Sequence, residues 1–401
     1  MGISRRHIMQ TAALGLWGWA SQRTAWANTE GPWPALVQAA KGQTVYFNAW
    51  GGGPAINAYI EWAAQTAKAQ FGFEVKHVKI TDAAEVVQRI QNELKAGRVN
   101  DGSVDLLWLN GENFHRLKQA QALFGPWVQG LPNWRYVDQQ KPVKLDFSVP
   151  TDGLEAPWGT AQLTFMANRA KTPQPPTSVQ AWLAHAQAHP GRLTYPQPPD
   201  FHGTTFVKQL LISLTPKPSV LQAPVTSAQF DTATAPLWAY LDRLHPHWWR
   251  KGQAFAPNIA QMHRMLADGV LDVSMTFNPN EAANLIAQGQ LPATVQAFGF
   301  EGGTIGNVHF LAIPRNARAS AAAQVFANFL LSPSAQARKA DPQIWGDPSV
   351  LDMALLPSAE RSAFAKPLPG QWSAPVPTLD EPHASWVEPL EKAWIQRYGS
   401  R

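Results

Sequence analysis

Residues 45–57, VYFNAWGGGPAIN, combine residue types that can bring bare backbone N–H groups to one point. The first three favour a strand, Gly51–Gly53 allow backbone angles that a Cβ atom forbids, and Pro54 suits the first turn of a helix. A helix that begins where a strand ends presents unpaired N–H donors, an arrangement that binds anions. The alternative is a tight strand–helix turn without a ligand, and this stretch alone is compatible with both.

The composition excludes several kinds of chemistry. The chain of 401 residues contains no cysteine, so it has no disulfide, iron–sulfur ligation, zinc–thiolate site, thiol nucleophile or lipoprotein anchor. We find no G-x-S-x-G, H-E-x-x-H, dinucleotide or Walker motif. His245 and His247 are a weak hint of a metal site, and a surface turn is the simpler interpretation. We therefore expect no cofactor and no bound metal.

Residues 1–27 have the features of an export signal. Arg5 and Arg6 resemble the twin-arginine motif, an apolar stretch follows, and Ala25–Ala27 has the form of a cleavage site. An ordinary secretory signal that happens to contain two arginines is the alternative. These residues contribute three of the 33 basic residues and none of the 28 acidic ones, so the rest of the chain carries +2. We expect a soluble periplasmic protein without a membrane anchor and without nucleic acid as a partner.

The elements that must position any site follow a regular order. Strands at 45–50, 73–80 and 104–109 alternate with helices, which predicts an open parallel sheet. A second α/β unit is expected at 164–304, and a strand at 305–313 returns to the first. The helix at 322–330 is expected to stop at Ser332-Pro333. The remainder reads as a proline-rich loop up to a last helix around 386–398.

Several motifs carry a resemblance to a known family. Val104–Leu109 followed by Asn110–Asn113 is similar to the strand and turn "D-V-V-W" of periplasmic solute-binding proteins of ABC importers. Leu271–Asn284 is similar to their strand–turn–helix, and Ile313–Gln336 resembles their "I-P-K-N-A … N-F-L-L-S-P-E-A-Q". The GGGPAIN, WLNGEN and TYPQPPDFHGTTF stretches look like the YnjB-type branch.

This resemblance implies an α/β, two-lobed fold of the periplasmic-binding-protein type II class, with a ligand cleft between the lobes. Lobe 1 would comprise 28–163 and 305–401, and lobe 2 would comprise 164–304. The expected function is that of an ABC solute-binding component. It captures a small solute by hinge closure and delivers it to an inner-membrane permease, without enzymatic activity and as a monomer.

The resemblance also implies that loops at the carboxyl ends of the strands line the cleft. The candidate ligand contacts in these loops are Trp50, Gly52, Asn57, Glu112, Asn113, Trp158, Tyr195, Asp200, His202, Phe277, Asn278 and Glu301. Each has a structural alternative: the tryptophans can pack across the hinge, Glu112 can cap a helix, Asp200 can belong to a turn, and His202 can be a structural histidine.

The candidate set is aromatic and acidic with few basic residues. A carboxylate pairs a positive charge, and an indole face adds a cation–π attraction of roughly 0.5–2 kcal/mol. This chemistry suits an organic cation, such as a thiamine-like molecule or a polyamine, whereas the glycine turn suits a ferric complex or an oxyanion. A secreted cofactor-dependent or hydrolytic enzyme is the alternative function, and a binding protein that serves a sensor is another.

Overall fold

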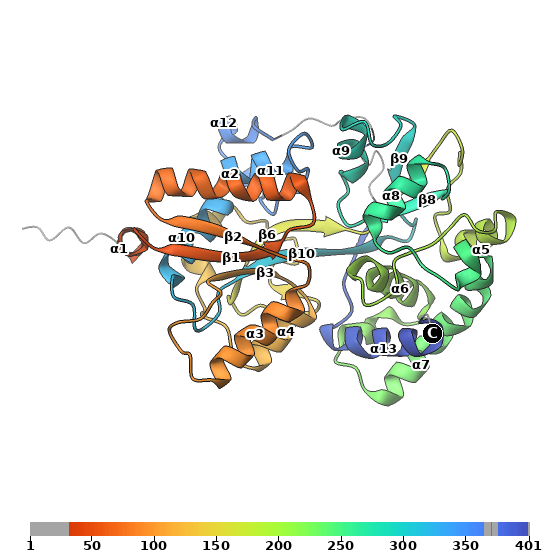
Figure 1. Ribbon diagram of the computed structural model, residues 1–401, viewed down its shortest axis with the longest axis horizontal. Helices are drawn as coiled ribbons and strands as arrows, with labels where there is room; N and C mark the ends of the chain where they lie inside the picture. The colour runs from red at the N-terminus through yellow and green to blue at the C-terminus, as the bar shows by residue number, and fades with distance from the viewer. Residues whose placement is uncertain (1–31, 365–369, 371–375, 400–401) are drawn as a thin grey trace, which may run out of the picture.

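The computed structural model describes residues 32–364, 370 and 376–399, and the predicted signal peptide lies outside this part of the chain. Two lobes lie side by side along the long axis of the molecule, joined by long strands (Figure 1). Within the described residues, no helix is both long enough and apolar enough to span a membrane.

The first lobe is built around a six-stranded sheet with β1 near its centre. β1 pairs in parallel with β2 on one side and with β3 on the other, as the sequence predicts. The strands and helices of this part are α1 (Pro32–Ala40), β1 (Thr44–Trp50), α2 (Pro54–Phe71), β2 (Glu74–Ile80), α3 (Ala83–Lys95), β3 (Leu106–Leu109), α4 (Glu112–Gln119), and the hairpin β4 (Leu145–Asp146) and β5 (Val149–Pro150).

Hydrophobic burial explains why these segments form these elements. Alternate residues of β1, including Val45 and Phe47, are fully buried. The buried face of α2 is the predicted one, with Ile56, Tyr59, Ile60, Ala63 and Ala67. Gly72 ends α2 with a φ of 76°, which a glycine adopts without strain. The β1–α2–β2 unit is therefore fixed by its own sequence.

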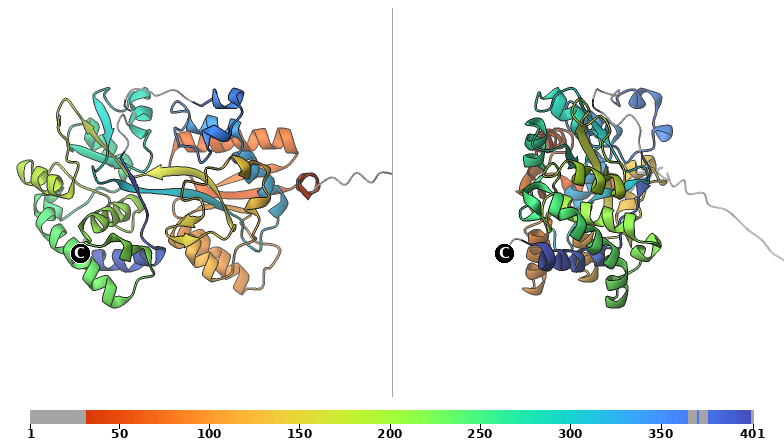
Figure 2. Two further views of the ribbon diagram at one scale, coloured as in Figure 1. Left: turned by 180° about the vertical axis from the view of Figure 1, so that it is seen from behind. Right: turned by 90° about the vertical axis from the view of Figure 1, so that its right-hand side faces the viewer.

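Two strands cross between the lobes. β6 (Glu155–Gln162) and β10 (Thr304–Ala312) are antiparallel, and their register shifts between His309 and Phe310. Phe310 packs in the core of the first lobe and Ile305 in that of the second. Figure 2 shows both strands running from one lobe into the other. We call β6 and β10 the hinge strands.

The second lobe contains a three-stranded antiparallel sheet with β7 in the middle. Its elements are β7 (Thr164–Asn168), α5 (Val179–Ala188), α6 (Phe201–Leu214), α7 (Ser227–Leu244), α8 (Ile259–Ala267), β8 (Val273–Thr276), α9 (Glu281–Ala287) and β9 (Val295–Phe298).

The chain after β10 differs from the sequence-based expectation. Pro333 begins a helix, because Ser332 accepts a hydrogen bond from the backbone N–H of Ala335 and caps it. The predicted proline-rich loop is therefore wrong for 333–340. The elements here are α10 (Ser320–Leu330), α11 (Pro333–Ala340), α12 (Ser358–Arg361), β11 (Thr378–Leu379) and α13 (Val387–Tyr398).

The last helix packs on the second lobe. Trp386, Leu390 and Trp394 lie in the same buried cluster as Trp182 and Phe206. The division of the chain into lobes stays a prediction, and this packing favours a revised division in which α13 belongs to lobe 2.

Candidate functional site

The glycine turn after β1 is held by its own hydrogen bonds. The backbone N–H of Gly51 donates to the Ile80 carbonyl at 3.0 Å, and the Asn57 side-chain amide donates to the Gly51 carbonyl at 3.0 Å. The Trp50 ring covers Gly52 so closely that a Cβ atom there would lie 2.5 Å from Cζ2 of the ring. Gly52 and Asn57 therefore support the turn, while Trp50 keeps 39% of its surface exposed.

The second turn of the first lobe lies between β3 and α4. Gly111 has a φ of 64°, and its N–H donates to the buried carboxylate of Asp146 at 2.7 Å. This turn places Glu112 at the start of α4, where burial raises the pKa of its carboxyl group. Asn113 is 8% exposed, and its Oδ1 atom has no hydrogen-bond partner among the described residues.

In the second lobe, the start of α6 carries the corresponding groups. Asp200 caps this helix by accepting hydrogen bonds from the N–H groups of His202 and Gly203 at 2.9 and 3.2 Å. Burial raises the pKa of Asp200, but the His202 side chain and these N–H groups outweigh it, and the pKa falls below its usual value. Phe201 is 40% exposed, and its ring centre lies 5.3 Å from that of the buried Phe277.

Trp50 and Phe201 stand out because they are the only exposed large aromatic residues in the described part of the chain. One comes from each lobe, at the carboxyl end of β1 and at the N-terminus of α6. Phe201 is a residue that sequence reasoning missed, although it lies within a loop expected at the site. Its position directly after a helix-capping aspartate is the sequence feature that could have indicated Phe201 as a site residue.

Acidic side chains from both lobes surround Glu112. The positive charge of Lys208 in α6 lowers the pKa of Glu112 and the charge of Glu381 raises it, although burial has the largest effect. Lys208 and Glu381 form a buried ion pair at 2.7 Å. Asp146 and Glu391 each interact electrostatically with Glu112, and burial raises the pKa of both. Arg116 also lowers the pKa of Glu112, so two cations, Lys208 and Arg116, lie beside these four carboxyl groups.

The remaining candidates lie elsewhere or have structural roles. Trp158 and Tyr195 have no exposed surface and belong to the cores of lobes 1 and 2, respectively. The hydroxyl of Tyr195 contacts Nε2 of the buried His245 at 2.9 Å. Glu301 is exposed and accepts a hydrogen bond from the Thr177 hydroxyl at 2.6 Å. Trp158 lies on the hinge strand β6. The side-chain amide of Asn278 donates to the carbonyl of Trp345, in the loop after α11, at 3.4 Å.

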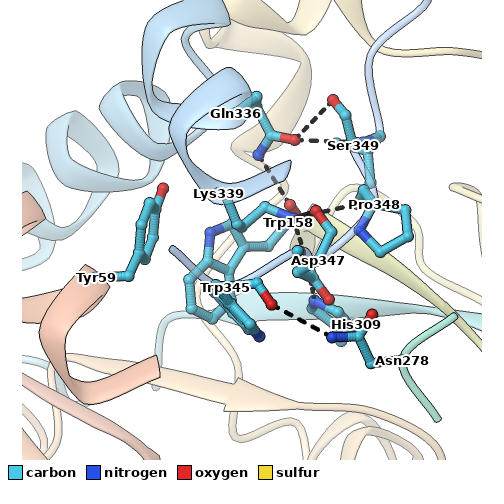
Figure 3. Close-up of polar contacts among 12 residues, drawn as sticks. Tyr59, Trp158, Asn278, His309, Gln336, Lys339, Trp345, Asp347, Pro348 and Ser349 are labelled. Atoms are coloured by element: carbon cyan, nitrogen blue, oxygen red, sulfur yellow. Dashed lines mark hydrogen bonds and ion pairs between the residues drawn. The ribbon is translucent and has the colours of Figure 1, made fainter. Parts of the chain in front are cut away.

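A buried ionic cluster lies against the hinge strands (Figure 3). Lys339 of α11 pairs with Asp347, and Nε2 of His309 in β10 contacts the same carboxylate at 3.0 Å. Gly159 of β6 makes room for the cluster, since a Cβ atom at this position would overlap with all three side chains. Sequence reasoning missed Lys339 and Asp347 because the segment after Pro333 was read as a proline-rich loop.

Metal binding has no support within the described ranges. No group of three or more histidine, aspartate or glutamate side chains there is arranged to hold a metal ion. His245 of the weak histidine motif is 6% exposed and packs within the second core.

Two lobes joined by crossing strands are the architecture that the sequence resemblance implies. The family model of the bacterial extracellular solute-binding proteins matches residues 61–366, and the chain belongs to this family. It is 55% identical over 368 residues to the protein YnjB of Escherichia coli (strain K12), covering 92% of this chain and 94% of that protein. This confirms the YnjB-like resemblance.

Solved structures share the fold at low sequence identity. A Listeria monocytogenes protein described as a candidate spermidine/putrescine ABC transporter has a TM-score of 0.59 and 16% identity, covering 88% of this chain and 98% of that one. A Trichodesmium protein in complex with iron and citrate has a TM-score of 0.59 and 13% identity, covering 89% and 100%. These similarities confirm the two-lobed α/β fold.

Proposed function

We propose that this protein is the periplasmic solute-binding component of an ABC importer and that it captures an organic cation between its lobes. Trp50 and Glu112 of lobe 1 and Phe201, His202 and Phe277 of lobe 2 form the proposed site. Two observations carry the proposal: each lobe has one exposed aromatic ring, and carboxyl groups outnumber cations around Glu112. A thiamine-like molecule or a polyamine fits this chemistry.

The proposal explains why the two rings are exposed. A ligand that contacts both lobes favours their closed arrangement, because only such a ligand binds the closed state more tightly than the open one. A cation between two aromatic faces gains an attraction of roughly 0.5–2 kcal/mol from each. The closed protein would then deliver the ligand to an inner-membrane permease. The candidate polyamine transporter among the structural neighbours supports this ligand class, and the neighbour bound to iron and citrate supports the alternative of an anionic ligand.

A thermal-shift panel on residues 28–401 tests this proposal. Thiamine, putrescine and spermidine represent organic cations, while phosphate, citrate and ferric citrate represent the ligands that a bare helix start would take. A ligand at a hundredfold excess over its Kd stabilises the protein by about 2.7 kcal/mol and raises the Tm by a few degrees. We expect at least one organic cation to raise the Tm. We also expect that compound to be recovered chemically unchanged after incubation with the protein. Shifts confined to the anions, or conversion of the compound, would contradict the proposal.

A further inference from the structure

We propose that the loop of residues 341–348 forms a non-covalent connection between the two lobes beside the hinge strands, which three asparagines at the start of α9 hold in place. The proposed connection sets the position of lobe 2 relative to lobe 1 when no ligand is bound. It goes beyond the proposed function, because it concerns the resting arrangement of the lobes whichever solute they bind.

The loop has a defined internal structure. The backbone N–H groups of Ile344, Trp345 and Gly346 all donate to the Asp341 carbonyl at 2.9 Å. Gly346 has a φ of 78°, a conformation that side-chain-bearing residues rarely adopt. The chain therefore turns sharply here and presents two neighbouring carbonyl groups, those of Trp345 and Gly346, to the second lobe.

On one side the loop is packed into lobe 1. The Trp345 ring is 5% exposed, and its centre lies 5.4 Å from the rings of Tyr59 and Trp158 and 5.8 Å from that of Trp108 (Figure 3). A tryptophan buried among aromatic rings anchors its backbone firmly, because removing such a large core side chain would leave a cavity.

On the other side the loop is bound by lobe 2. Nδ2 of Asn284 donates to the Trp345 carbonyl at 2.6 Å, and Nδ2 of Asn280 donates to the Gly346 carbonyl at 2.6 Å. Asn278 adds a longer contact of 3.4 Å to the Trp345 carbonyl. Asn280 occupies the N-cap position of α9 but makes no capping hydrogen bond to that helix. Its amide serves the contact between lobes instead.

The same loop is attached to both hinge strands. The Pro348 carbonyl accepts a hydrogen bond from the N–H of Thr160 in β6 at 3.1 Å, and Asp347 pairs with His309 of β10. Rotation of lobe 2 about the hinge strands must therefore either carry the loop along or break its bonds to α9. Because α9 begins next to Phe277 of the proposed site, the loop also links that site to the hinge.

The absence of cysteine from the chain allows a direct test. Ala69 on α2 and Ala188 on α5 are exposed, and replacing both by cysteine gives one spin label on each lobe. Double electron–electron resonance then measures the distribution of distances between the labels in the ligand-free protein. We expect Asn280→Ala with Asn284→Ala to broaden the distribution and shift its mean relative to the otherwise unchanged labelled protein.

A matched control removes similar hydrogen bonds within one lobe. The Asn133 amide donates to the Asn328 carbonyl at 2.8 Å, both in lobe 1, so Asn133→Ala should leave the distribution unchanged. If the double variant does not fold, Gly346→Ala replaces it: its Cβ atom would lie 3.0 Å from the Asn284 amide and displace the loop. Distributions of a folded variant that superimpose on that of the parent would overturn the proposal. This result would leave the proposed function standing, since no ligand is involved.

Discussion

Trp50 and Phe201 leave large parts of their rings in water, although burying apolar area stabilises a protein by roughly 25 cal/mol per Å². Exposed apolar surface of this kind marks a binding site when it lies beside polar groups that can orient a ligand. Glu112 is such a group on the first lobe and His202 on the second. At this scale Trp50 and Phe201 are the members of the proposed site that the core of the fold uses least, whereas Phe277 is part of the buried core of lobe 2.

Truncation of these side chains should therefore reduce binding without unfolding the protein. We expect Trp50→Ala and Glu112→Ala each to weaken binding of the cation at least tenfold, about 1.4 kcal/mol, without lowering the Tm of the ligand-free protein. Calorimetric titration measures the affinity. Ile395→Ala on α13 removes another exposed side chain and serves as the control. Unchanged affinity in both site variants would remove Trp50 and Glu112 from the site.

Glu391 gives a prediction for the dependence of stability on pH. Burial and the nearby charge of Glu112 raise its pKa to about 7, while the Thr204 hydroxyl works in the opposite direction. The folded protein then binds a proton that the unfolded chain releases near pH 4.5, so Glu391 favours the folded state at low pH.

Relative to Glu391→Gln, the wild type should lose unfolding free energy as the pH rises from about 4.5 to about 7. The loss is at most about 3 kcal/mol, because each pKa unit corresponds to about 1.4 kcal/mol and the group is only partly buried. Urea unfolding of both proteins at several pH values measures it. A constant difference between them across this range would show that the carboxyl group is not perturbed.

At the scale of elements, helix starts position the site. α2 and α4 begin at the ends of β1 and β3, and α6 and α9 begin on the facing lobe. Three of these starts are fixed by side-chain hydrogen bonds: the Gly51–Asn57 hydrogen bond, the Gly111–Asp146 hydrogen bond and the Asp200 cap. The side chains at the starts of α2 and α6 therefore inherit their positions from short stretches of sequence, whereas α4 depends on Asp146, 35 residues further along the chain.

Two variants of Asp200 can distinguish a helix-capping role from a ligand-binding role. We expect Asp200→Ala to destabilise the protein by about 1 kcal/mol, because it removes the acceptor for two N–H groups. Asp200→Asn keeps an acceptor oxygen and should retain most of the stability, which denaturant unfolding measures. If Asn lowers affinity for the cation while stability is kept, the charge of Asp200 also acts on the ligand, contrary to our assignment of a capping role only.

The local character of these elements explains what the sequence could predict. The β1–α2–β2 unit was readable because its apolar spacing, glycines and Pro54 all favour the same structure. Trp158 and Tyr195 were less readable, because an aromatic residue in a strand or loop can face either a core or a ligand. The His309–Asp347 contact joins a strand residue to a position 38 residues later, in a stretch that has no periodic pattern of its own, so no sequence signal indicated it.

At the scale of the whole molecule, β6, β10 and the proposed 341–348 connection join the described lobes, and the Ser148 hydroxyl of lobe 1 also donates a hydrogen bond to Gln222 of lobe 2. Separate buried cores lie on either side of these links, so the proposed closure would move each lobe as a unit about the hinge strands. The proposed function requires this motion, because a permease can recognise the ligand-bound protein only if the ligand changes the arrangement of the lobes.

The most direct test is the distance between spin labels at positions 69 and 188, measured with and without the compound that raises the Tm. The account predicts that the compound shortens the mean distance and narrows its distribution, and that Trp50→Ala strongly reduces this change at a ligand concentration near the Kd of the parent protein. Binding of the compound with an unchanged distance distribution would contradict capture between the lobes.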